Sequence, residues 1–438
     1  MKQTSNRKPW LWIPTLYFAE GIPYFLVNTI SVTMFTGMGM PPGEMSLFTS
    51  LLYLPWVIKP FWSPFVDIFK SKRWWIITMQ IIMSAAMCIL PFVLPKGPGT
   101  EFTSMPLFYV TLGLFWFTAF ASATHDIAAD GFYMLGLDTN KQAEFVGVRS
   151  TFYRLSSIFG QGVLVAVAGI LHTKTSDIHY AWQITLGIAA VIFACVTLYH
   201  TWSLPKPAMD KMNVAGSAKN IARDFLMTFK SFFTKKYIWL ALLFMLLYRL
   251  PEAFLVKMIT PFMLGGTESG GLGMNETEVG VVYGTIGTIA LLLGGILGGI
   301  AISRLGLKKS LWPMALSLTL PCLSFVFLAA FQVQNNWIIM SCVALDQFGY
   351  GFGFTAYMMY LIYFSDGKFK TAHYSICTGF MALSMMLPGL VAGYIQEAVG
   401  YTNFFIIVML CCLVTVAVTM KIRSIVDPDF GKEIKKIK

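Results

Sequence analysis

Apolar residues gather in twelve long segments along this chain of 438 residues, and short polar stretches separate them. A segment of about 20 apolar residues is long enough to cross the hydrocarbon core of a membrane as a helix. Because a lone span satisfies its backbone hydrogen bonds only as a helix, each segment predicts one transmembrane helix. The predicted spans are residues 10–35, 45–67, 74–95, 105–136, 145–171, 180–202, 237–264, 278–303, 309–331, 337–365, 372–396 and 402–423. We therefore predict an all-α membrane protein with twelve transmembrane helices.

The longest polar break follows the sixth span and divides the helices into two equal sets. It predicts an N-terminal six-helix half over 1–202, a linker over 203–236 and a C-terminal six-helix half over 237–438. In the linker, Phe225 and Phe229 recur at helical spacing among Lys and Arg. This pattern is typical of an amphipathic helix on a membrane surface, here expected on the cytoplasmic face.

Charged residues make up 12% of the chain and hydrophobic residues 56%, far from the composition of a soluble protein. The net charge of +11 comes from alternate loops, such as the one with Lys70, Lys72 and Arg73. The opposite loops hold only Lys96 and Lys174. By the positive-inside rule, both termini are expected in the cytoplasm. The basic surplus thus indicates topology, and we expect no nucleic-acid partner.

The seven cysteines all lie in apolar runs, and none has metal-ligand spacing with a histidine. They are interpreted as small buried side chains. We expect no disulfide framework, no metal site and no cofactor.

Acidic and basic residues recur deep inside the predicted spans. A charge at that depth costs a few kcal/mol or more, so it must face a partner or a water-filled cavity. Seven such residues occur, in both halves of the chain: Glu20, Lys59, Asp126, Arg154, Arg249, Glu252 and Asp346. So many charges predict a polar pathway through the membrane, which favours a transporter.

In the first span, Glu20, Tyr24 and Asn28 recur every four residues and share one helix face. Gly21 and Pro23 predict a kink that opens the helix near the middle of the membrane. The shared face is either a binding stripe for substrate or protons, or a polar clamp between helices.

Lys59, in the second span, either faces a cavity or snorkels toward the cytoplasmic edge. In the fourth span, Asp126 and Asp130 lie one helical turn apart. Two carboxylates at such a short separation are suited to binding and releasing a proton. Asp130 lies nearer the cytoplasmic end and also suits a gating ion pair. His125 is interpreted as a packed, hydrogen-bonded ring.

Asp67, Asp130 and Arg149 are expected to cluster at the cytoplasmic ends of the second, fourth and fifth spans. With Arg73, in the loop after the second span, they form the predicted gating group.

Arg154, in the fifth span, is the strongest candidate for an anion anchor. Its guanidinium stays charged and can hold a carboxylate or phosphate with two parallel hydrogen bonds. Gln161 lies on the same helix face and is expected to hydrogen-bond the substrate.

In the seventh span, Arg249 and Glu252 lie one turn apart. They either neutralise each other or work at a site that the proline between them loosens. Lys257 follows as a further candidate for substrate carboxylates. In the tenth span, Asp346 and Tyr350 lie four residues apart in a glycine-rich stretch.

The loops after the second and eighth spans share a weak repeat, SPFVDIFKSKR at 63–73 and GIAISRLGLKK at 299–309. Both resemble the loop motif G-x-x-x-D-R-x-G-R-K of the major facilitator superfamily, although Ser63 stands for the glycine and Ser303 for the aspartate. Duplicated six-helix halves are what that fold uses for alternating access. The resemblance implies that the gating group closes the cytoplasmic side.

Six segments resemble the AmpG-type muropeptide permease family, in a branch of the superfamily that also contains acetyl-CoA transporters. They are residues 17–23, 59–67, 125–131, 153–155, 248–254 and 389–400. The resemblance implies a proton-driven importer of N-acetylglucosaminyl-anhydro-N-acetylmuramyl peptides, in the bacterial inner membrane, for peptidoglycan recycling. The alternative is another anionic solute, such as a different sugar, a peptide or an acetyl-CoA-like ester.

A symporter of this kind would carry protons on its acids and hold substrate carboxylates with its bases. The predicted proton-coupling residues are Asp126, Glu20, Asp346 and Glu252. The predicted substrate-binding residues are Tyr24, Asn28, Lys59, Arg154, Gln161, Arg249, Lys257 and Tyr350.

Two other classes fit less well. A membrane-embedded transferase would need a hydrophilic loop with clustered Asp or His, and a receptor without transport would not need duplicated halves. We therefore expect a transporter rather than an enzyme, acting as a monomer in the lipid bilayer and driven by the proton gradient.

Overall fold

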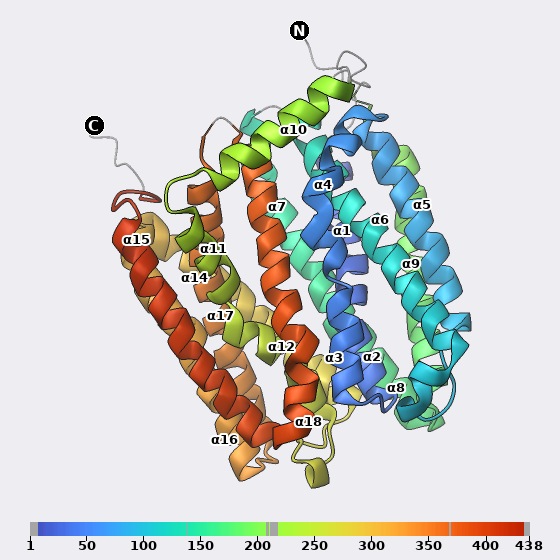
Figure 1. Ribbon diagram of the computed structural model, residues 1–438. Coiled ribbons are helices and arrows are strands. Elements are labelled where there is room, and N and C mark those ends of the chain that lie inside the picture. Colours follow the sequence, from blue (N-terminus) through green and yellow to red (C-terminus); the bar gives the residue numbers. More distant parts are fainter. Residues whose placement is uncertain (1–7, 138, 207–209, 211–217, 368, 433–438) are drawn as a thin grey trace. The chain divides into compact units, whose positions relative to one another are not determined.

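The computed structural model describes residues 8–137, 139–206, 210, 218–367 and 369–432. Within these ranges the regular structure is helical (Figure 1). The α-helices are α1 (Ile13–Phe25), α2 (Ser31–Gly37), α3 (Pro42–Leu51), α4 (Leu54–Ile68), α5 (Lys72–Ile89), α6 (Pro106–Gly136), α7 (Thr139–Ser157), α8 (Val165–Thr175), α9 (Ile178–Ser203), α10 (Ala218–Phe233), α11 (Ile238–Leu247), α12 (Leu250–Leu264), α13 (Glu276–Val279), α14 (Thr288–Leu305), α15 (Leu307–Thr319), α16 (Leu323–Phe331), α17 (Asn336–Ser365) and α18 (Lys370–Ile425).

The twelve predicted transmembrane helices are confirmed. In the described part of the chain, eight stretches are long and apolar enough to cross a membrane. One of them, Ala372–Ile425, contains Gly400 with a φ of 75°, which ends one helix and begins the next, so α18 holds two predicted spans. The first, second and tenth predicted spans are helical too, as α1 with α2, α3 with α4, and α17.

Several helices begin at a side chain that caps their free backbone N–H groups. Ser71 accepts from the N–H of Trp74 at the start of α5. Asp177 caps α9 and Asn335 caps α17 in the same way. Such a cap satisfies a donor that has no partner inside the helix, which is why these polar residues mark the helix starts.

Three spans contain a wider π-helical stretch, at Leu26–Ile30, Ile158–Leu164 and Gly280–Gly287. The first begins three residues after Pro23, whose ring removes a backbone donor from the α-helical pattern. The disturbance predicted in the first span therefore takes the form of a π-helical stretch. Such stretches are frequent at functional sites because they change the direction of side chains.

The described residues form two compact units. The first takes those within 1–40 and 58–225, and the second those within 41–57 and 226–438. The boundaries of these units differ from those of the predicted N-terminal half (1–202), linker (203–236) and C-terminal half (237–438). The second predicted span contributes to both units, since α3 belongs to the second unit and most of α4 to the first.

Segment 41–57 belongs to the second unit because α3 packs closely against α18. The N–H of Gly43 donates to Glu397 Oε1 at 2.8 Å, and the N–H of Gly393 donates to Ser46 Oγ at 2.9 Å. A Cβ on Gly393 would collide with the carbonyl oxygen of Pro42. Gly393 thus allows close helix packing, and its partner is α3.

The linker contains α10, whose C-terminal part carries apolar side chains on both sides. Leu226, Met227 and Phe233 are exposed, whereas Phe232 is buried in a core that includes Ile238. Exposed apolar residues beside Lys and Arg are what an interfacial helix presents to a membrane. The side chains of residues 218–222 and 224 lie outside the described part of the chain.

Candidate functional site

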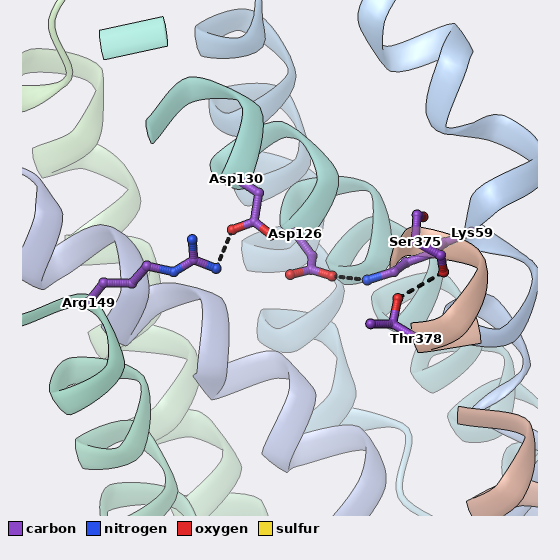
Figure 2. A network of polar contacts seen from close by, with 6 residues as sticks. All are labelled: Lys59, Asp126, Asp130, Arg149, Ser375 and Thr378. Atoms are coloured by element: carbon purple, nitrogen blue, oxygen red, sulfur yellow. Dashed lines mark hydrogen bonds and ion pairs between the residues drawn. The ribbon is translucent and has the colours of Figure 1, made fainter. Parts of the chain in front are cut away.

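Lys59 of α4 and Asp126 of α6 form an ion pair in the first unit. Their Nζ and Oδ2 atoms lie 2.5 Å apart, and the side chains are 16% and 22% exposed (Figure 2). Lys59 therefore points to a carboxylate rather than along the helix toward the membrane edge. A pair that is mostly removed from water is strongly coupled, because solvent screens it little.

Asp130 lies one turn after Asp126 and pairs with a different cation. Its Oδ1 lies 2.5 Å from Arg149 Nη2 of α7 (Figure 2). The Arg149 guanidinium also lies over the Tyr17 ring at 4.4 Å and near the Tyr133 ring at 5.5 Å. The two neighbouring aspartates of α6 thus face separate cations.

Glu20 of α1 joins the same group of charges. It is buried, and its Oε2 has no hydrogen-bond partner. Its carboxyl group lies near enough to that of Asp126 for the two charges to interact, and it also senses the charges of Asp130 and Arg149. Gly21 brings α1 this close to α7, because a Cβ there would collide with the Ser156 side chain. Two carboxyl groups whose charges interact this strongly favour holding one proton between them.

The other members of the predicted stripe lie on and beyond α1. Asn28 lies in the π-helical stretch and donates from Nδ2 to the carbonyl of Tyr24 at 3.1 Å. Its Oδ1 is buried without a hydrogen-bond partner. The Tyr24 ring packs 6.4 Å from the Tyr153 ring of α7. Asn28 therefore keeps one acceptor available for another donor.

Arg154 and Gln161 follow each other along the fifth predicted span. Arg154 is half-buried in the last turn of α7. Gln161 lies in the π-helical stretch that follows and donates from Nε2 to Ser157 Oγ at 2.8 Å. The chain continues from α7 through this stretch into α8 without a break, so Arg154 lies inside one continuous helical span.

The predicted gating group is described in part. Asp130 and Arg149 form the ion pair given above, whereas the side chain of Asp67 lies outside what the structure describes. Arg73 donates to the carbonyl oxygens of Thr201 and Leu204 at the end of α9, at 2.6 and 3.3 Å. Arg73 thus binds the backbone of a neighbouring helix end.

Asp210 is a linker residue that our sequence analysis did not single out. Its two carboxylate oxygens accept from the N–H groups of Lys72 and Arg73, at 2.6 and 3.0 Å. It therefore adds a second cap to the N-terminus of α5, where a negative charge is favourable. No local pattern predicts this contact, because 137 positions separate Asp210 from Arg73.

A buried chain of hydrogen bonds behind Asp126 was also missed. Gln80 of α5 joins His125 Nε2 of α6 to His200 Nδ1 of α9, each at 3.0 Å. His200 Nε2 then reaches Thr15 Oγ1 of α1 at 3.0 Å. The expected packed ring of His125 is thus one member of a network that connects four helices of the first unit. In the sequence, these residues stand out only as single polar residues within apolar spans, which does not show that they contact one another.

In the second unit, Arg249 lies at a break in the seventh predicted span. It separates α11 from α12 and has non-helical backbone angles, φ −100° and ψ 14°. Its Nη2 donates to the Tyr350 hydroxyl at 2.5 Å, and its guanidinium lies 4.7 Å from the Phe354 ring. Broken transmembrane helices are typical of transporter binding sites, because they expose helix ends at mid-membrane.

Glu252 and Asp346 are fully buried acids of the second unit. Glu252 lies in the first turn of α12, and both of its carboxyl oxygens lack a hydrogen-bond partner. It senses the charges of Asp346 and Arg249. Asp346 of α17 accepts from Gln347 Nε2 at 3.1 Å. Acids with so few partners are costly to bury as carboxylates, which favours a functional role.

Lys257 lies about two turns after Arg249 and has different partners. Its Nζ donates to Thr49 Oγ1 at 2.9 Å and lies 5.5 Å from the centre of the Tyr53 ring. Tyr350, by contrast, belongs to the Arg249 group. The structure therefore separates the predicted bases of the second unit into two places.

Outside the spans, Lys235 ties the loop before α11 to the end of α17. It donates to the carbonyl oxygens of Phe364 and Asp366, at 2.5 and 2.7 Å. Burial lowers the pKa of this ammonium, although Cys377 and Asp366 act in the opposite direction. The described residues contain no group of His, Cys, Asp and Glu that could hold a metal ion.

Paired charges within long apolar helices, two units and a broken seventh span are features of secondary transporters. The sequence profile of the Major Facilitator Superfamily matches residues 15–361. The chain belongs to this superfamily. Members of it are membrane transporters, so the chain is an integral membrane transporter and not an enzyme.

Two curated relatives within the superfamily align over most of the chain. The anhydromuropeptide permease of Escherichia coli strain K12 is 25% identical over 407 residues, covering 89% of this chain and 75% of the relative. AmpG 4 of Rickettsia felis is 25% identical over 419 residues, covering 94% and 96%. The resemblance stated from sequence segments thus extends over nearly the whole chain.

Solved structures with this fold are more distant in sequence. The D-xylose-proton symporter has a TM-score of 0.73 at 7% identity and covers 97% of this chain and 99% of its own. The nucleoside transporter NupG has a TM-score of 0.67 at 17% identity and covers 95% and 98%. At these identities the likeness shows the fold alone.

Proposed function

We propose that this member of the superfamily is a proton-coupled importer of an amino-sugar conjugate such as an anhydromuropeptide. The observation that carries proton coupling is the ion pair of Asp126 with Lys59, with the buried Glu20 carboxyl group near enough to interact with it. Two carboxyl groups that compete for one ammonium change partners when one of them gains or loses a proton. The substrate class is supported by the resemblance to the anhydromuropeptide permease of Escherichia coli.

In this proposal, Asp126 and Glu20 carry protons in the first unit, and Glu252 and Asp346 do so in the second. Arg154, Arg249, Lys59 and Lys257 hold the substrate's carboxylates, and Tyr24, Asn28, Gln161 and Tyr350 hydrogen-bond its sugar and amide groups. The substrate enters by alternating access, without a cofactor.

The gate proposed for the cytoplasmic side consists of Asp67, Arg73, Asp130 and Arg149. The ion pair between Asp130 and Arg149 supports it, because a partly exposed pair of 2.5 Å can break and form during a cycle. Arg73 would act by holding the end of α9 in place.

The proposed location is the bacterial inner membrane, with both termini in the cytoplasm. The basic loops support this orientation. In a variant without its native cysteines, a cysteine at Thr234 should react with a membrane-impermeant label from the cytoplasmic side. A cysteine at Ser269 should react from the opposite side. Labelling of both from one side would overturn the orientation.

The substrate is tested with purified protein in liposomes under a pH gradient, acid outside. We expect uptake of N-acetylglucosaminyl-anhydro-N-acetylmuramic acid, with or without its peptide, and none of N-acetylglucosamine alone. Acetyl-CoA serves as the competing anionic solute. Uptake of acetyl-CoA in place of the disaccharide would replace the amino-sugar proposal, and uptake unaffected by collapse of the gradient would remove proton coupling.

A further inference from the structure

Lys257 lies in a small polar group that α3, α12 and α18 form within the second unit. We propose that Lys257, Thr49 and Ser50 form a subsite for one carboxylate group of the transported solute. The inference rests on the proposed function, because it takes an amino-sugar conjugate as that solute.

The Lys257 ammonium is buried, with 3% of the residue exposed. Its Nζ donates to Thr49 Oγ1, and the Thr49 hydroxyl in turn donates to the carbonyl of Met45 at 2.7 Å. The threonine is therefore held in place as an acceptor. An ammonium has three donors, and among the described residues Lys257 has an acceptor for one of them.

Other bases deep in the spans have counter-charges that Lys257 lacks. Lys59 pairs with Asp126, Arg149 pairs with Asp130, and Arg249 lies near enough to Glu252 to interact with its charge. No carboxylate of the described chain pairs with Lys257, which has only a hydroxyl and the face of an aromatic ring. A buried cation without a counter-charge is costly, so it indicates a place that an anion occupies during function.

Ser50 is a second, independent observation at the same place. Its hydroxyl is fully buried and has no hydrogen-bond partner. A Cβ on Gly389 of α18 would collide with Ser50 Oγ and would lie 3.3 Å from Lys257 Cε. The Ser50 hydroxyl and the end of the Lys257 side chain therefore both lie close to the same glycine. The Ser50 hydroxyl and the Lys257 ammonium are thus two neighbouring groups with hydrogen-bond donors that no described acceptor uses.

The charge of the group selects the ligand. One ammonium and one free hydroxyl make a donor set with a single positive charge. A carboxylate has one negative charge and two oxygens that accept strong charge-assisted hydrogen bonds, so it matches this set. A phosphate monoester has nearly two negative charges and would need a second cation, which none of the contacts described for Lys257 supplies.

The experiment compares two probes that differ in charge: N-acetylmuramic acid and its methyl ester. Binding to the purified protein is measured from the shift in unfolding temperature over a range of probe concentrations. The variants are Lys257→Met, Lys257→Arg, Ser50→Ala and, as the matched control, Lys174→Met at an exposed lysine of α8.

We expect the wild type to bind the acid about tenfold or more tightly than the ester, as a charge-assisted contact implies. Lys257→Met should bind both probes equally, Lys257→Arg should keep part of the preference, and Ser50→Ala should reduce it a few-fold. Lys174→Met should match the wild type. Without probe, Lys257→Met should unfold at the same or a higher temperature, since it removes an unpaired buried charge.

Three results would overturn the subsite: no preference for the acid in the wild type, no probe binding at all, or full preference in Lys257→Met. Normal binding in Lys257→Met with loss of gradient-driven accumulation would instead make Lys257 a proton carrier. Failure of the proposed function looks different, because the wild type would then discriminate acid from ester yet not take up the disaccharide into liposomes.

Discussion

Lys59 Nζ lies 2.5 Å from Asp126 Oδ2, although 67 positions separate the two residues in the chain. Each side chain, alone, would be a costly charge inside an apolar span. Together they neutralise each other, and the Glu20 carboxyl group interacts electrostatically with the same aspartate. The pair therefore holds α4 to α6 in a way that the protonation of neighbouring acids can alter.

The first prediction concerns the stability of this pair. Lys59→Met or Asp126→Asn should each lower the free energy of unfolding by roughly 1–3 kcal/mol, because each leaves the partner charge unpaired. This is less than for a fully buried pair, since both side chains keep some exposure to solvent. The double variant should recover part of the loss. Unfolding temperatures of all four proteins in detergent measure the coupling, and strictly additive losses would argue against the pair.

The second prediction concerns proton coupling. Asp126 ranks first as carrier, Glu20 second and Asp346 third, because Asp126 pairs with Lys59 and its charge also interacts with that of Glu20. Asp126→Asn should abolish accumulation against a gradient yet keep counterflow between loaded vesicles, which needs no net proton movement. If Asp126→Asn still accumulates substrate with normal pH dependence, the role passes to Glu20.

Sequence patterns were sufficient to predict the twelve spans and the presence of charges within them. Both follow from local composition, because a span must be apolar over its whole length and any exception stands out. Local composition could not decide between the alternative roles of each charged residue. Whether Lys59 meets an acid or the membrane edge depends on Asp126, which lies on another helix.

Other features depend on how helices pack. The assignment of 41–57 to the second unit follows from contacts of α3 with α18, some 350 residues away in the chain. The partner of Lys257, Thr49, becomes visible only through that packing. The π-helical stretch at Gly280–Gly287 contains no proline, so no local residue predicts it. Contacts between distant parts of the chain determine which residues come together at the candidate site. They cannot be predicted from local patterns in a single sequence.

The third prediction concerns Arg154. Arg154→Ala should weaken binding of an anionic substrate by tenfold or more, and Arg154→Lys should restore it only in part, because lysine lacks the planar fork that binds two oxygens. Competition binding with the disaccharide acid measures the effect, and Gln161→Ala on the same span serves as the comparison for a neutral contact. Undiminished affinity in Arg154→Ala would remove the anchor role.

The fourth prediction concerns the gate. Arg149→Gln should break the ion pair with Asp130 and lower the transport rate several-fold while changing substrate affinity little. Asp67→Asn should act in the same direction if Asp67 belongs to the gate. Initial rates of uptake, set against binding constants, separate the two effects. Equal losses in rate and affinity in both variants would place these residues at the binding site instead.

The last prediction concerns the buried network of Gln80, His125, His200 and Thr15. Gln80→Met keeps the size of the side chain but leaves His125 Nε2 and His200 Nδ1 without partners. Each buried polar group left unpaired costs about 1–3 kcal/mol, so the variant should unfold several degrees lower than the wild type.

Ser84→Ala is the matched control, because Ser84 contacts Thr197 and so joins the same two helices, α5 and α9, through one hydrogen bond at 3.0 Å. It should cost much less, since the Thr197 hydroxyl keeps its hydrogen bond to the carbonyl of Phe193 and no imidazole is left unpaired. If Gln80→Met and Ser84→Ala unfold at the same temperature, the network adds no more than an ordinary contact between helices. A larger loss in Gln80→Met, with counterflow unchanged at the temperature of the assay, would show that the network stabilises the first unit without taking part in binding.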